Sequence, residues 1–207
     1  MCFLLSIVAG GFGEGYVPSK IIATGDAAAT TNNVLAHENL FRAGFAAYLI
    51  EALCDITLAL VLYALLRPVQ KDLSLLAAFF GLVGTAIYAI GEVSLFSILV
   101  RNESHMLAQV LFGYAANVSM LFYGVASLLR GYLIYRSAYL PRFLGVLLII
   151  AAVGFVAMTF VFVLAPRYAS NFLLLPMFVA MIAITAWFLV KGVDVAKWEA
   201  KVRGSAG

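Results

Sequence analysis

Long apolar runs separated by short polar connections fill most of the 207-residue sequence. A helix needs about 20 mainly apolar residues to cross a bilayer, because each residue advances the helix by about 1.5 Å and the hydrocarbon layer is about 30 Å thick. Hydrophobic residues make up 65% of the chain and charged residues only 11%, whereas about a quarter of residues are charged in soluble domains. The sequence therefore predicts an integral membrane protein of the all-α class, a polytopic bundle of helices.

Six transmembrane helices in one domain, residues 1–207, are predicted. The expected spans are about residues 2–17, 44–66, 73–100, 106–129, 143–164 and 172–190. The first run is short and has the length of a signal-peptide core, but no basic region precedes it, so we interpret it as a transmembrane helix whose start is clipped. Residues 18–41 are predicted to form an outer loop with a short helix, for which Asp26 is the expected N-cap, and residues 191–207 a cytoplasmic tail.

The distribution of basic residues predicts the orientation. Nine basic residues fall on one side of the predicted spans, namely Arg67, Lys71, Arg130, Arg136, Arg142, Lys191, Lys197, Lys201 and Arg203. Four fall on the other side, namely Lys20, Arg42, Arg101 and Arg167. Basic residues are enriched in cytoplasmic connections, so we expect both termini in the cytoplasm and the chain as a multi-pass protein of the cell (cytoplasmic) membrane.

Four carboxylates lie within the apolar runs or at their ends. Glu51 and Asp55 are four residues apart, so a helix places both on one face, with Tyr48 one turn earlier. A carboxylate at membrane depth costs about 2.5 to 3.5 kcal/mol on insertion scales, so the folded protein must provide partners for it. With the predicted orientation, counting residues places these two acids, Glu92 and Glu14 in the outer half of the membrane.

A polar pocket that opens to the outside is the simplest functional interpretation. Its predicted ligand-binding residues are Glu51, Asp55, Glu92, Glu14, Tyr48, Tyr88 and Asn117. Such a pocket would bind or transport a proton, another cation or a small amine. Alternatively, the carboxyls hydrogen-bond neighbouring helices and only link them, a contact worth about 0.6 kcal/mol, and the protein is an accessory or assembly subunit of a larger membrane complex.

A third hypothesis is a membrane-embedded lipid-processing enzyme in which one of these carboxylates is the general base. The sequence offers no nucleophile or metal motif for it, and it contains no P-loop, GxSxG, HExxH or CxxC motif. We therefore expect no catalytic residues and no cofactor. His37 and His105 fall on the same side as the acids and are the candidates for a metal site, although loop histidines are usually solvated. Cys2 and Cys54 are interpreted as small apolar fillers.

The expected partner is the lipid bilayer, with other membrane subunits or a second copy of the chain as further candidates. The basic residues record orientation, so no nucleic acid is expected. Tyr135, Arg136, Tyr139 and Arg142 combine aromatic and basic groups, which anchor helices at the cytoplasmic interface and can meet anionic headgroups.

Several segments carry a resemblance to a known family. They are GYLIYRSAYLPRFLGVLL from Gly131, GDAAATTNN from Gly25, LFRAGF from Leu40, LYALLRPV from Leu62 and FLVKGV from Phe188. Over nearly the whole chain the sequence resembles an uncharacterised bacterial membrane family, domain of unknown function 4386. The resemblance implies a compact six-helix bundle in the bacterial inner membrane, and it implies no activity. Members of the family often carry an arginine at the position of Gly81 and an acid at that of Met181, so this chain departs from the family there.

Overall fold

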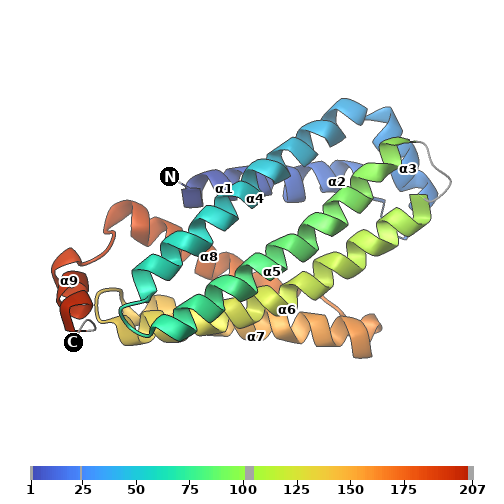
Figure 1. Ribbon diagram of the computed structural model, residues 1–207. Coiled ribbons are helices and arrows are strands. Elements are labelled where there is room, and N and C mark those ends of the chain that lie inside the picture. The colour runs from blue at the N-terminus through green and yellow to red at the C-terminus, as the bar shows by residue number, and fades with distance from the viewer. Residues whose placement is uncertain (1, 24, 101–104, 205–207) are drawn as a thin grey trace. The chain divides into compact units, whose positions relative to one another are not determined.

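The computed structural model describes residues 2–23, 25–100 and 105–204, and these residues form helices joined by short connections (Figure 1). No strand occurs within these ranges, which confirms the all-α fold class. Five helices are long and apolar enough to cross a membrane. They are Glu38–Leu66, Lys71–Leu99, Met106–Ser137, Arg142–Leu164 and Phe172–Val190. The chain is thus a helical protein with the composition of a multi-pass membrane protein.

The chain divides into two compact units. Unit 1 comprises Met1–Leu58 and Thr85–Ala116, and unit 2 comprises Ala59–Gly84 and Asn117–Gly207. The helices α4 (Glu38–Leu66), α5 (Lys71–Phe96) and α6 (His105–Ser137) each contribute one part to each unit. The candidate acids all belong to unit 1.

The first helical segment of unit 1 contains a π-helical stretch. The elements α1 (Cys2–Gly10), η1 (Gly11–Tyr16) and α2 (Val17–Ile21) follow one another directly and together contain 20 residues. The sequence GFGEGY of η1 is rich in glycine, a residue with a low propensity for the α-helix. Helicity continues past the predicted end near Val17, because Pro18 is tolerated in the first turn of α2.

The first segment approaches the backbone of α4 closely. A Cβ atom added to Gly13 would lie 2.8 Å from the carbonyl oxygen of Gly44. A Cβ atom on Gly44 would in turn lie 2.9 Å from Cγ1 of Val17. Only glycine permits this approach, and small residues serve the same purpose in membrane helix pairs generally.

A short helix, α3 (Ala27–Ala36), forms in the connection between α2 and α4. The side chain of Asp26 caps it by accepting a hydrogen bond from the amide of Ala29 at 2.8 Å. Asn33 Nδ2 donates to the carbonyl of Ile21 at 3.1 Å and so ties α3 to the end of α2. Because only His37 separates α3 from α4, the second long helix begins earlier than its predicted start near Gly44.

In unit 2, α6 continues through Arg130 and Arg136 to Ser137, eight residues beyond the predicted end at Leu129. No helix breaker occurs before Pro141, which is the N-cap of α7 (Arg142–Leu164). The helices α6 and α7 meet at Gly131 and Gly145, where a Cβ atom on Gly131 would lie 2.8 Å from the carbonyl oxygen of Gly145.

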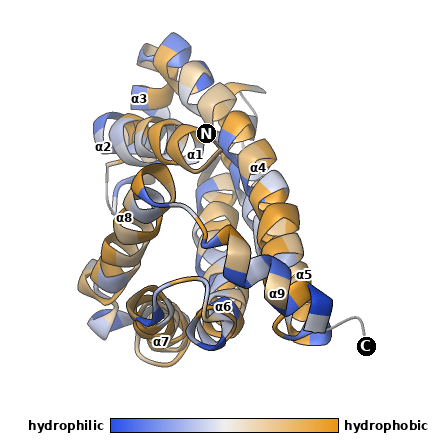
Figure 2. Ribbon diagram, turned by 90° about the vertical axis from the view of Figure 1, so that its left-hand side faces the viewer, coloured by the Kyte–Doolittle hydropathy of each residue, from blue (hydrophilic) through white to orange (hydrophobic). Residues whose placement is uncertain are grey.

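The remaining elements of unit 2 are η3 (Pro166–Tyr168), η4 (Asn171–Leu174), α8 (Leu175–Val190) and α9 (Val195–Gly204). Apolar residues cover much of α4, α7 and α8, whereas α9 carries many hydrophilic residues (Figure 2). Many large apolar side chains on the long helices are exposed, for example Leu60 at 66% and Val153 at 63%. Such exposure suits helices surrounded by lipid.

Candidate functional site

Carboxylates from three elements gather in unit 1. Glu14 lies on η1, Glu51 and Asp55 lie on α4, and Glu92 lies on α5. Glu51 is close enough to the other three carboxylates to interact with their charges. In the described part of the chain, no lysine or arginine forms an ion pair with Glu14, Glu51 or Glu92. The site therefore brings together carboxyl groups from three helical elements.

Two tyrosines lie among these acids. The side chain of Tyr88 lines the same cavity as Glu14 and Glu92. The ring of Tyr48 packs against that of Tyr88 with centroids 5.7 Å apart. Tyr48 is only 4% exposed, and its hydroxyl has no hydrogen-bond partner. A buried hydroxyl normally finds a partner, so the Tyr48 hydroxyl is an unused polar group beside the acids.

Asp55 and Glu51 differ in their surroundings. Ser6 Oγ donates a hydrogen bond to Asp55 Oδ1 at 3.1 Å, which joins α1 to α4. Glu51 Oε2 is buried without a hydrogen-bond partner. The Glu51 carboxylate lies against Gly10, where an added Cβ atom would be 2.6 Å from Oε2. Gly10 thus leaves room for the carboxylate, a pairing that was not predicted from the sequence.

A cavity of about 40 Å³ adjoins the acids. Its polar lining residues are Glu14, Tyr88 and Glu92. Its other lining residues are Gly13, Val17, Pro18, Ile21, Ile22, Phe41, Gly44, Phe45, Leu95 and Phe112. A water molecule needs about 10–15 Å³ of such volume, so the cavity of about 40 Å³ has room for about three particles of that size.

An apolar cluster lies next to the cavity, around α3. It consists of Val17, Ile21, Val34, Phe41, Leu95, Ile98 and Ala108, with Leu40, Phe96, Leu99 and Phe112 packed against it. Several of these side chains also line the cavity. On this side, the cavity therefore borders packed apolar side chains.

The other predicted pocket residues are placed differently. Asn117 belongs to unit 2, where its main-chain carbonyl oxygen accepts a hydrogen bond from Thr159 Oγ1 at 2.9 Å. His37 is the C-cap of α3, and the side chain of His105 lies outside the described residues. Among the described residues, no group of three or more His, Cys, Asp or Glu side chains is arranged to hold a metal ion.

The two cysteines, interpreted from sequence as fillers, are neighbours in unit 1. The thiols of Cys2 on α1 and Cys54 on α4 are both free and lie within hydrogen-bonding reach of each other. Like Ser6 and Asp55, they bring the start of the first segment to the middle of α4.

The four residues predicted to anchor the interface belong to unit 2 and separate into two kinds. Tyr135, Arg136 and Arg142 are exposed, and the Arg142 guanidinium lies 5.6 Å from the centre of the Tyr135 ring. Tyr139 is only 3% exposed, and its hydroxyl donates to the carbonyl oxygen of Leu65 at 2.7 Å. Burial raises the pKa of the Tyr139 phenol above its ordinary value.

The carbonyl of Leu65 has a second side-chain donor, which the sequence did not indicate. Trp198 Nε1 on α9 donates to it at 3.1 Å. The amide that would pair with this carbonyl in a continuing helix belongs to Val69, and it bonds to Leu66 instead. Two aromatic side chains therefore satisfy a carbonyl at the end of α4.

Comparison with known proteins places the chain in a family. No solved structure matches it. An uncharacterised protein of Archaeoglobus fulgidus is 35% identical over 102 residues, which are 49% of this chain and 56% of that protein. The match therefore spans little more than half of that relative. The model of a domain of unknown function, DUF4386, matches residues 1–192. Because this match covers almost the whole chain and confirms the resemblance seen in the sequence, the protein belongs to the DUF4386 family.

Proposed function

We propose that the protein binds or transports a proton or a small monovalent cation at the acidic site of unit 1, with Glu14, Glu92 and Tyr88 as its contacts. The observation that supports this most is that Glu14 and Glu92, from separate helical elements, line one cavity and have no ion pair with a basic side chain among the described residues. Ionisable groups inside a membrane are costly and commonly mark ion or proton pathways.

The volume of the cavity limits the size of the ligands that can bind there. About 40 Å³ admits a hydronium, ammonium or dehydrated alkali ion, each comparable in size with a water molecule. The unpartnered hydroxyl of Tyr48 and Oε2 of Glu51 supply further oxygen atoms close by. Asp55 is already bonded to Ser6, which favours a role for it in joining α1 to α4.

The proposal includes an orientation in the cytoplasmic membrane. The first segment would be a sixth span, since its 20 helical residues reach about 30 Å. Both termini would then lie in the cytoplasm, in agreement with the excess of basic residues in the connections on that side. The acidic site would lie in the outer half of the membrane, next to the outer connection that contains α3.

Thermal unfolding of the purified protein in detergent tests the site. We expect ammonium or one alkali ion to raise the melting temperature, since a ligand at a hundredfold excess over its Kd stabilises the native state by about 2.7 kcal/mol. The variant Glu14→Gln with Glu92→Gln should lose this response and still fold. Glu199→Gln, which removes an exposed acid on α9, is the matched control and should respond like the wild type.

Proton exchange needs a separate measurement in proteoliposomes that contain a pH-sensitive dye. A proton flux that the Glu14→Gln and Glu92→Gln double variant abolishes would support transport. If neither cation-dependent stabilisation nor proton flux differs between this variant and the control, the site has no ligand of this class. An accessory subunit would then be the better hypothesis.

A further inference from the structure

Basic side chains gather at one end of unit 2, around α9. The connections that meet there are held together by hydrogen bonds, because Tyr139 and Trp198 both donate to the Leu65 carbonyl and the amide of Asp194 donates to the carbonyl of Tyr139 at 3.3 Å. Figure 1 shows α9 beside the connections α4–α5 and α6–α7. The exposed basic residues of these segments are Arg67, Lys71, Arg136, Arg142, Lys191, Lys197, Lys201 and Arg203. Only Asp72, Asp194 and Glu199 oppose them on the same segments.

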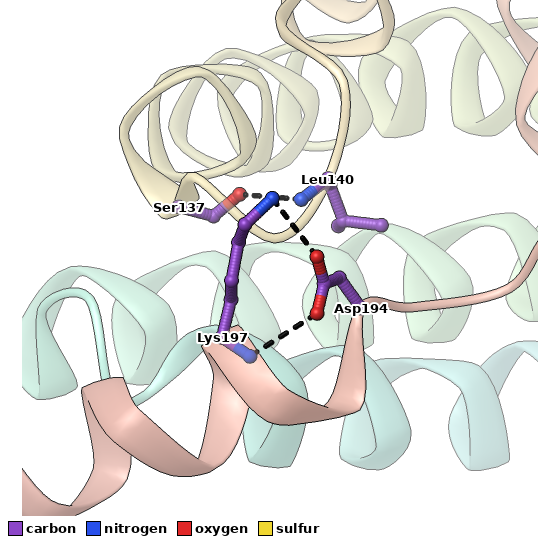
Figure 3. A network of polar contacts seen from close by, with 4 residues as sticks. All are labelled: Ser137, Leu140, Asp194 and Lys197. Carbon is purple, nitrogen blue, oxygen red and sulfur yellow. Dashed lines mark hydrogen bonds and ion pairs between the residues drawn. The ribbon is translucent and has the colours of Figure 1, made fainter.

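The helix α9 is held in a defined position by its first turns. Asp194 Oδ1 accepts a hydrogen bond from the amide of Lys197 at 3.2 Å, and Asp194 Oδ2 pairs with Lys197 Nζ at 2.9 Å (Figure 3). The hydrogen bonds from Lys197 lower the pKa of Asp194, so this cap is ionised at neutral pH. Trp198 attaches the next part of the helix to Leu65. The end of α9 is thereby presented at a fixed place on unit 2.

The basic side chains nearest the end of α9 are Lys201 and Arg203. Among the described residues, neither Lys201 nor Arg203 forms an ion pair. The helix is amphipathic, since Val195, Trp198 and Val202 recur at steps of three and four. Val195 is 60% exposed, although it is apolar. A basic helix with an exposed apolar residue is typical of helices that lie at a charged membrane surface.

The adjoining helices indicate whether lipid or water surrounds the protein next to these basic residues. Exposed apolar side chains continue up to it, with Val61 near the end of α4 at 50% and Val190 at the end of α8 at 80%. Side chains of this kind are accommodated by hydrocarbon, so the layer that meets the basic residues is the headgroup layer of a bilayer.

We propose that this basic end of unit 2, which we call the α9 surface, binds the headgroups of anionic phospholipids. It comprises the eight basic residues named above, with Lys201 and Arg203 as contacts supplied by α9. The proposal is independent of the acidic site, because no residue is shared between them. Each basic side chain near an anionic surface strengthens binding about fivefold.

The test is a titration of the full-length protein in mixed micelles with phosphatidylglycerol, phosphatidylcholine or inorganic phosphate, followed by thermophoresis. We expect saturable binding of phosphatidylglycerol, with an apparent Kd that Lys201→Gln and Arg203→Gln together raise about 25-fold. The control variant, Lys20→Gln with Arg167→Gln, removes the same charge from exposed positions outside this surface and should change the Kd less than about twofold.

A second variant distinguishes loss of charge from loss of folding as the cause of weaker lipid binding. Lys201→Arg with Arg203→Lys keeps both charges and should bind phosphatidylglycerol like the wild type. Equal weakening in the control variant would overturn the proposal, because net charge alone would then govern binding. Equal affinity for phosphatidylcholine, or competition by inorganic phosphate at the same concentration, would overturn it as well.

Discussion

The glycines of α6 differ in what surrounds them. Gly131 stands against the backbone of α7, and a Cβ atom there would lie 2.8 Å from the carbonyl of Gly145 and 3.1 Å from the amide nitrogen of Ile149. Gly113 has nothing within 4 Å of the corresponding position. Both are glycines of one helix, yet only Gly131 makes a close contact with another helix.

Alanine substitutions at these two positions should act in opposite directions. Gly131→Ala should destabilise the protein by about 1–3 kcal/mol, because the backbones of α6 and α7 must separate. Gly113→Ala should be neutral or stabilise it by up to about 1 kcal/mol through helix propensity. Thermal unfolding of both variants in one detergent measures the difference. A Gly131→Ala variant as stable as the wild type would show that α6 and α7 do not approach as closely as described.

At the scale of elements, the sequence predicted the existence of the long helices better than their ends. Apolar runs predict helices because lipid requires every backbone group to bond internally. The helix α6 continues to Ser137, beyond the end of the predicted span at about Leu129. Arg130 and Arg136 mark the predicted end of the span, but they do not end the helix, because long basic side chains can extend to the interface from within it. The contacts of Glu51 with Gly10 and of Trp198 with Leu65 were not predictable. Every residue has a backbone carbonyl, and many glycines lack a neighbour that fills the space of a side chain, so the sequence does not indicate which of them is used.

The attachment of α9 to α4 can be measured with Tyr139→Phe and Trp198→Phe. Each removes one donor to the Leu65 carbonyl and keeps most of the aromatic packing, so each should cost about 1 kcal/mol of unfolding free energy. Because the two donors share an acceptor, the double variant should cost more than the sum. The carbonyl keeps one partner in each single variant and loses both in the double variant. Strictly additive costs in a double-mutant cycle would argue against a shared acceptor.

Tyr139 also predicts a pH dependence. Burial raises the pKa of its phenol in the folded state, so the stability that it contributes is fully present below the ordinary tyrosine pKa of about 10 and is lost as the pH rises further. The free energy of unfolding of the wild type should therefore exceed that of Tyr139→Phe by a constant amount between about pH 7 and 9, and by less above about pH 10. A difference in unfolding free energy that stays constant up to about pH 11 would contradict the burial of the Tyr139 phenol.

At the scale of the whole molecule, the distribution of charge governs how the chain is placed in a membrane. The four candidate acids belong to unit 1, and the eight basic residues of the α9 surface belong to unit 2. An acidic site and a basic surface on the same chain suit a bilayer, which offers an apolar interior and charged headgroups. The sequence predicted a single domain with Asn117 beside the acids, and it could not show that Asn117 belongs to a different unit from them.

The proposed orientation predicts the result of reporter fusions at the C-terminus. Green fluorescent protein attached after Gly207 should fluoresce, and alkaline phosphatase at the same place should be inactive, since the first folds in the cytoplasm and the second requires an oxidising compartment. Phosphatase activity at this position would reverse the orientation and move the acidic site to the inner half of the membrane.

The shared carbonyl of Leu65 has a consequence for biosynthesis. Its donor Trp198 lies 133 residues later in the chain, and translation at about 5–20 residues per second delays that donor by on the order of ten seconds. During this interval the end of α4 holds an acceptor that only water, Tyr139 or the insertion machinery can satisfy. The nascent helix therefore cannot reach its final hydrogen bonding until Trp198 has been synthesised, so a segment made much later completes the end of α4.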